Sequence, residues 1–100
     1  DRAIALFEKA LELNPNDYVS LTALAGAYAN FLKDYKKAVK FYKKALKIKD
    51  NYDIALFGLG LTYAQMGLKK QARSQFEKTI AVTQDGDLKD AVKKALVLVQ

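Results

Sequence analysis

Apolar residues recur along the chain at three- and four-residue spacings, which is the pattern of amphipathic helices. The pattern predicts six helices, at residues 1–13, 17–31, 35–48, 53–66, 69–83 and 87–99. Pro15 prevents the first helix from continuing, and Asp17 offers the N-cap of the second. Gly67 suits a left-handed C-cap after the fourth helix, and Asp87 offers a cap for the last. We therefore expect an all-α chain.

The same residue classes return at a fixed period. One copy comprises Leu56, Leu59, Gly60, Tyr63, Ala72 and Phe76. Another, 34 to 35 positions earlier, comprises Leu21, Leu24, Ala25, Tyr28, Ala38 and Tyr42. The second half of the unit also occurs at the N-terminus, as Ala3, Phe7 and Ala10, followed by Pro15. Small residues allow helices to approach closely and aromatic rings fill the remaining space, so this period indicates a repeat architecture.

These positions resemble the tetratricopeptide repeat, a helix–turn–helix unit of about 34 residues. The earlier copy has one extra residue near residues 31–34, Asp50 and Gln84 stand where a closing proline is expected, and Thr79 replaces an alanine. The resemblance implies a right-handed α-solenoid of antiparallel helix pairs, with about six helices. It divides the chain into the second helix of a preceding repeat, two repeats and a divergent C-terminal helix, at residues 1–16, 17–51, 52–86 and 87–100.

Composition restricts the chemistry that is available to the chain. The 100 residues include no histidine and no cysteine, so an imidazole base, a thiol nucleophile and a two-histidine zinc site are absent. Gly58 and Gly60 invite a nucleotide-loop interpretation, but Tyr63 occupies the third glycine position and the run lies inside a predicted helix. Residues 85–87 are better explained as a turn and helix cap than as a cation site. We expect no enzyme activity, no cofactor and no metal.

The chain has no apolar run that approaches the roughly 20 residues needed to cross a bilayer. It begins within a repeat and without an initiator methionine, so we expect it to be a piece of a longer protein. A cytoplasmic location is the default expectation for such a lysine-rich chain without cysteine.

In the family that the chain resembles, the first helix of each pair lines a concave surface where ligands usually bind. By position, the corresponding groove residues here are Val19, Thr22, Ala23, Gly26, Asn30, Ile54, Phe57, Gly58, Leu61 and Gln65. One subclass grips a C-terminal carboxylate with Lys, Asn and Arg at such positions. Thr22, Gly26 and Gly58 stand there instead, which disfavours binding of Hsp70 or Hsp90 tails.

What remains of this strip is mostly apolar. Phe57, Ile54 and Leu61 would anchor the apolar face of a helix or an extended segment, with Phe57 as the main anchor. Asn30 and Gln65 would orient that ligand through hydrogen bonds. The alternative is that neighbouring repeats or the last helix cover these residues.

The net charge of +6 is concentrated in the third predicted helix. Its lysines recur at three- and four-residue spacing, opposite the apolar stripe, as Lys36, Lys37, Lys40, Lys43, Lys44 and Lys47. They form either an ordinary solvated face or a basic surface for acidic protein, nucleic acid or anionic membrane. Arginine, which is favoured for phosphate recognition, occurs only as Arg2 and Arg73. We therefore favour the solvated face over nucleic acid or membrane as a partner.

The sequence thus predicts a non-catalytic protein–protein interaction scaffold or adaptor that binds a partner's peptide or helix in an apolar concave groove. One alternative is self-assembly into a homo-oligomer through the terminal helices, because residues 95–99 are all apolar and the N-terminal half-repeat is open. Continuation of the chain over residues 95–99, or a frayed end, explains them equally well. The other alternative is the basic surface described above.

Overall fold

The computed structural model describes residues 2–100, and Asp1, where the first predicted helix starts, lies outside them. Within these residues there are six α-helices and no strand. The helices are α1 (Arg2–Leu13), α2 (Tyr18–Asn30), α3 (Tyr35–Ile48), α4 (Asp53–Gln65), α5 (Lys69–Val82) and α6 (Gly86–Leu98). The predicted all-α class is confirmed, and the predicted boundaries of α2 to α6 differ from the observed ones by at most one residue.

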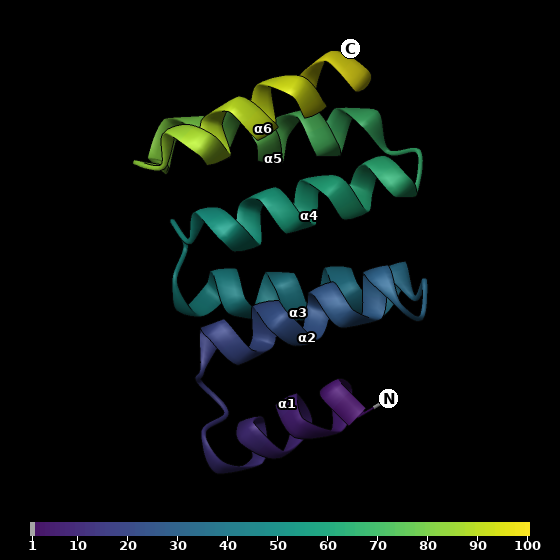
Figure 1. The fold of residues 1–100 in the computed structure, drawn as a ribbon, viewed down its shortest axis with the longest axis vertical. Helices are drawn as coiled ribbons and strands as arrows, with labels where there is room; N and C mark the ends of the chain where they lie inside the picture. Colours follow the sequence, from purple (N-terminus) through teal and green to yellow (C-terminus); the bar gives the residue numbers. More distant parts are fainter. Residues whose placement is uncertain (1) are drawn as a thin grey trace.

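The helices are stacked along the longest axis of the molecule, from α1 at one end to α6 at the other (Figure 1). Short connections alternate between the two sides of the stack, so consecutive helices run antiparallel. Each helix contacts the next, and α2 also contacts α4. The first helices of the two pairs α2–α3 and α4–α5 therefore lie in one layer, which is the arrangement of a helical repeat solenoid.

Aspartate side chains begin several of the helices. The Asp17 carboxylate accepts a hydrogen bond from the Ser20 backbone N–H at 3.2 Å and from the Ser20 hydroxyl at 2.8 Å. At the last helix the expected cap is wrong by two residues: Asp85, not Asp87, accepts hydrogen bonds from N–H groups of the first turn. The helix starts at Gly86, so Asp87 already lies inside it, where its charge still suits the positive end of the helix dipole.

The first helix of each pair ends with a residue in the left-handed conformation. Gly67 has φ of 79°, which confirms the predicted cap, and the Tyr63 carbonyl accepts a hydrogen bond from the residue that follows it. In the earlier repeat Lys33 takes this role with φ of 54°, and the Asp34 N–H donates to the Tyr28 carbonyl at 3.0 Å. This turn is one residue longer, so it accommodates the extra residue of the first repeat.

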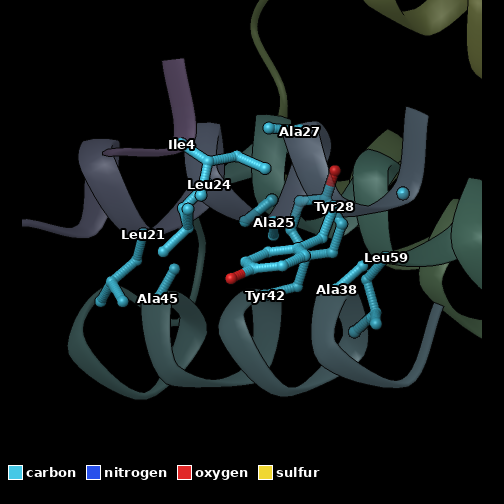
Figure 2. Close-up of a cluster of buried hydrophobic side chains, with 12 residues drawn as sticks. Ile4, Leu21, Leu24, Ala25, Ala27, Tyr28, Ala38, Tyr42, Ala45 and Leu59 are labelled. Atoms are coloured by element: carbon cyan, nitrogen blue, oxygen red, sulfur yellow. The ribbon is translucent and has the colours of Figure 1, made fainter. Parts of the chain in front are cut away.

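The main core is built from α1 to α4, and Figure 2 shows its buried side chains. The Tyr42 ring from α3 lies among the small side chains of Ala25, Ala38 and Ala45, all three of which are fully buried. Leu59 joins the same cluster from α4. The alternation of small and aromatic positions in the sequence is thus what allows α2, α3 and α4 to pack closely.

A second cluster holds α6 on the second pair. Phe76 of α5 is fully buried there against Val92, Ala95 and Val99. The Arg73 guanidinium donates a hydrogen bond of 2.7 Å to the Val99 carbonyl, which places a cation at the negative end of α6. Of the apolar residues 95–99, Ala95 and Val99 are buried, whereas Val97 and Leu98 are exposed.

Buried threonines make their hydrogen bonds inside the fold. Thr79, which stands at a position where the family pattern has alanine, is fully buried and donates its hydroxyl to the Gln75 carbonyl at 2.7 Å. Thr83 donates to the Asp53 carboxylate and so joins the end of α5 to the start of α4. Because the Thr79 hydroxyl is satisfied locally, its exchange for alanine leaves the packing of the repeat intact.

Candidate functional site

The groove residues expected from the sequence lie on α2 and α4, and their exposure varies widely. Val19, Ile54, Leu61, Asn30 and Gln65 are exposed. The half-buried members of the set are Ala23, Gly26, Phe57 and Gly58. Thr22 is buried. The exposed members therefore give this layer an apolar surface with two amide side chains on it.

Two cavities lie on either side of α4, and Leu61 and Gln65 line both of them. The first cavity has a volume of about 160 Å³, lies between α2 and α4, and is lined by Ala29, Asn30, Lys33, Tyr35, Tyr42, Gly58, Leu61, Thr62 and Gln65. The second cavity has a volume of about 270 Å³, lies between α4, α5 and α6, and is lined by Leu61, Ala64, Gln65, Lys69, Phe76, Ala95, Leu98 and Val99. Four of the expected groove residues, Asn30, Gly58, Leu61 and Gln65, thus meet at the first cavity.

Tyr42 lines the first cavity, although the sequence assigned it to the core. Its ring reaches from α3 to the space between α2 and α4, with only 6% of the residue exposed. A Cβ added to Gly26 would lie 3.5 Å from the Tyr42 hydroxyl, and one added to Gly58 would lie 2.5 Å from it. Gly58 is therefore the floor position that this tyrosine requires to be free of a side chain.

The hydroxyl of Tyr42 makes no hydrogen bond with another described residue. Among those residues, no side-chain polar atom that is fully enclosed lacks a partner, so this unpaired hydroxyl must be open to the cavity that its residue lines. Burial of the ring raises the pKa of Tyr42 above its usual value. The phenol is accordingly a neutral hydrogen-bonding group at ordinary pH. The signal in the sequence was a tyrosine at a position where phenylalanine would pack equally well.

The remaining groove residues lie outside both cavities. The Phe57 ring is half-buried because it packs on the second cluster, with its centroid 5.9 Å from that of Phe76. The hydroxyl of Thr22 donates to the Tyr18 carbonyl of its own helix at 2.8 Å. Leu61, rather than Phe57, is therefore the apolar side chain that is best placed to meet a ligand at the cavities.

The lysines of α3 point away from the core. All six members of the set, Lys36, Lys37, Lys40, Lys43, Lys44 and Lys47, are exposed. The Lys37 ammonium lies 5.2 Å from the centroid of the Tyr28 ring, and that of Lys44 lies 5.6 Å from the centroid of the Phe41 ring. Such contacts stabilise a cation at a surface by about 0.5–1 kcal/mol. They fit an outer face that solvates the solenoid, and its use as a binding surface stays a prediction.

Two searches of residues 2–100 concern other kinds of site. No group of three or more acidic, histidine or cysteine side chains is arranged to hold a metal ion in this part of the chain. None of its helices combines the length and the apolar character that a bilayer span requires.

Family models described as "TPR repeat" and "Tetratricopeptide repeat" match three overlapping stretches of the chain. They cover residues 6–40, 32–67 and 54–82. Together the matches extend from the first helix to the end of the fifth. A search of curated proteins found no match.

Several solved structures are similar to this one. YrrB, described as "a TPR protein with an unusual peptide-binding site", is 29% identical with a TM-score of 0.79, and the match covers 91% of this chain but only 47% of YrrB. The first TPR of Spaghetti (RPAP3), bound to the HSP90 peptide SRMEEVD, is 19% identical with a TM-score of 0.81, covering 97% of this chain and 78% of that one. The N-terminal domain of stress-induced protein-1 from C. elegans is 21% identical with a TM-score of 0.74, covering 88% and 74%.

Proposed function

We propose that this chain, which belongs to the tetratricopeptide repeat family, is a non-catalytic scaffold or adaptor segment that binds a peptide or helix of a partner protein across α4. The observation that carries the proposal is the pair of adjacent cavities that share Leu61 and Gln65. The peptides named for YrrB and Spaghetti support the general mode of binding.

The magnitude of the apolar contribution indicates what kind of complex to expect. Complete burial of a leucine or isoleucine side chain contributes about 1.5–3 kcal/mol, and Leu61 is already more than half buried, with 42% exposed. Leu61 and Ile54 together therefore contribute about 2 kcal/mol, well below the roughly 8 kcal/mol of a micromolar complex. Most of the affinity must come from ligand side chains that enter the cavities and from hydrogen bonds to Asn30 and Gln65.

The acidic peptide bound by Spaghetti does not define the ligand here. Thr22 uses its hydroxyl within its own helix, and Gly26 and Gly58 present no side chain at all. These three positions carry none of the charged groups that would hold a C-terminal carboxylate. The proposed ligand is instead an internal segment with at least one apolar side chain.

Two substitutions with matched exposure test the groove. Leu61→Lys places a charge between the two cavities, whereas Val82→Lys does so at the end of α5, where 38% of the valine is exposed. Both proteins would be compared with the wild type for binding to peptides selected from a phage library of random 12-residue segments, with fluorescence anisotropy as the assay. Circular dichroism would establish that both variants are folded.

We expect the selected peptides to be rich in apolar residues and Leu61→Lys to weaken their binding about tenfold or more, because a charge replaces a buried apolar contact. Val82→Lys should change the affinity less than twofold. Equal binding by all three proteins would place the ligand elsewhere and refute the groove.

Self-association is a second candidate, favoured by exposed apolar side chains at both ends of the stack. Leu6 and Leu13 of α1 and Val97 and Leu98 of α6 are all more than half exposed. Burial of these residues between copies predicts a sedimentation coefficient that rises with concentration. A constant monomer mass up to about 1 mM, the dissociation constant of a complex worth only about 4 kcal/mol, would exclude it.

A further inference from the structure

The two cavities beside α4 differ in chemistry. Phe76, Ala95 and Leu98 give the second cavity an apolar wall. The first is surrounded by groups that can donate hydrogen bonds: the amides of Asn30 and Gln65, the phenols of Tyr35 and Tyr42, and the Lys33 ammonium, and no carboxylate lines it. A ligand group that enters the first cavity therefore meets donors and a positive charge.

The Tyr42 hydroxyl indicates that this cavity is incomplete without a ligand. The neighbouring hydroxyl of Thr62 is satisfied, since it donates to the Gly58 carbonyl at 2.8 Å. The Tyr42 hydroxyl, on a residue that is more than nine-tenths buried, has no such partner among the described residues. A buried donor without a partner is costly, so an occupant that supplies an acceptor gains that cost back on binding.

The volume of about 160 Å³ limits the occupant to a single side chain. A cavity of about 150 Å³ accommodates a molecule of the size of benzene. An aspartate or glutamate carboxylate with its methylene groups fits within this volume, whereas a helix or a strand does not.

We propose that the first cavity is a subsite for the side-chain carboxylate of an aspartate or glutamate in the bound segment, with the Tyr42 hydroxyl and the Lys33 ammonium as the donors that select it. The inference rests on the function proposed above, and it names the ligand chemistry of that groove. A carboxylate is an acceptor only, which suits a wall of donors. A ligand amide would turn its own N–H groups toward Lys33, and an apolar side chain would leave the Tyr42 hydroxyl without a partner. The net charge of +6 also favours an acidic partner.

Tyr42→Phe removes only the hydroxyl and is therefore the decisive variant. Because that hydroxyl makes no hydrogen bond within the described chain, and because Phe76 holds the equivalent position of the next repeat, we expect the variant to fold with an unchanged melting temperature. Wild type and variant would be tested against peptides from the phage selection, synthesised with amidated C-termini, and against the same peptides with the recurrent Glu changed to Gln.

Hydrogen bonds to charged groups predict that Tyr42→Phe binds the Glu peptide about tenfold to a hundredfold more weakly. The Glu-to-Gln change should weaken binding to the wild type by a similar factor and to the variant by much less. The subsite is overturned if the selected peptides contain no recurrent Asp or Glu, or if Tyr42→Phe binds them within twofold of the wild type while Leu61→Lys does not. If neither substitution changes binding, the proposed function fails together with the subsite.

Discussion

Gly26 and Gly58 allow the packing of Tyr42 to be tested by the same substitution at two places. Both glycines lie inside helices, on α2 and α4, and both face the Tyr42 ring. A Cβ at Gly26 would lie 3.5 Å from the Tyr42 hydroxyl, which is ordinary contact. A Cβ at Gly58 would lie 2.5 Å from the ring carbon Cζ and from the hydroxyl, so the ring or the helix must move. Alanine should therefore have opposite effects at the two sites.

Two opposing terms set the magnitude of these effects. Alanine is better than glycine inside a helix by about 1 kcal/mol, so Gly26→Ala should increase the free energy of unfolding by about that amount. The same gain applies at Gly58, but overpacking a close-packed core costs about 1–3 kcal/mol. The Tyr42 ring is held by fully buried alanines and has little room to shift. Gly58→Ala should therefore lower the free energy of unfolding by up to about 2 kcal/mol.

Thermal unfolding followed by circular dichroism measures both variants. A change of 1 kcal/mol shifts the melting temperature of a domain of this size by about 4–8 °C, so Gly26→Ala should melt higher than the wild type and Gly58→Ala lower. In a Tyr42→Leu background the clash is absent, and Gly58→Ala should become stabilising. If Gly58→Ala raises the melting temperature of the wild type as much as Gly26→Ala does, Tyr42 does not pack against Gly58 and the floor of the first cavity is misplaced.

Two further predictions concern the ends of α2. The Ser20 hydroxyl and, second to it, the Ser20 N–H lower the pKa of Asp17, so its stabilising effect is present above the pKa of the unfolded chain, near 4, and is lost as the pH falls through the lower folded-state value. Asp17→Asn cannot ionise, so the gap in melting temperature between wild type and variant should narrow from about pH 5 to pH 2, and a constant gap would contradict the capping role. Lys33→Gly should raise the melting temperature, because a left-handed conformation costs a residue with a side chain about 1–2 kcal/mol. The reverse change, Gly67→Ala, meets no neighbouring atom and should lower it through the backbone alone; the same direction for both would refute the argument.

The helices could be predicted from the sequence because their signals are local. Apolar spacing located each helix, and Pro15, Asp17 and Gly67 marked ends that the structure reproduces. Asp85 and Asp87 could not be distinguished in the same way, since both are short acidic residues beside Gly86 and either can cap a helix. The choice depends on the direction from which the chain leaves Thr83, whose hydroxyl accepts a hydrogen bond from the Asp85 N–H.

The site was less predictable because it depends on contacts between repeats. Repeat positions placed Asn30, Leu61 and Gln65 on the inner layer, and these residues do line the cavities. The environment of Phe57 depends on α6, whose divergent sequence gave no alignment that would show the ring packing near Phe76. Tyr42 was assigned to the core by its repeat position, and its ring is buried there. That its hydroxyl also reaches a cavity depends on Gly58, a residue of the following repeat.

The difference between Tyr42 and Phe76 gives the groove a direction. The two residues hold equivalent positions in successive repeats, and each lines the cavity on its own side of α4. One oxygen atom thus makes the cavity between α2 and α4 polar, whereas the cavity bounded by α6 has an apolar wall. A segment that fills both must present an acceptor on one side of Leu61 and an apolar side chain on the other. Reversing its direction would place the acceptor against Phe76 and leave the Tyr42 hydroxyl unpaired, and each mismatch costs about 1–3 kcal/mol. A peptide with its sequence reversed should therefore bind at least tenfold more weakly, and equal binding of both directions would show that the two cavities are not used together.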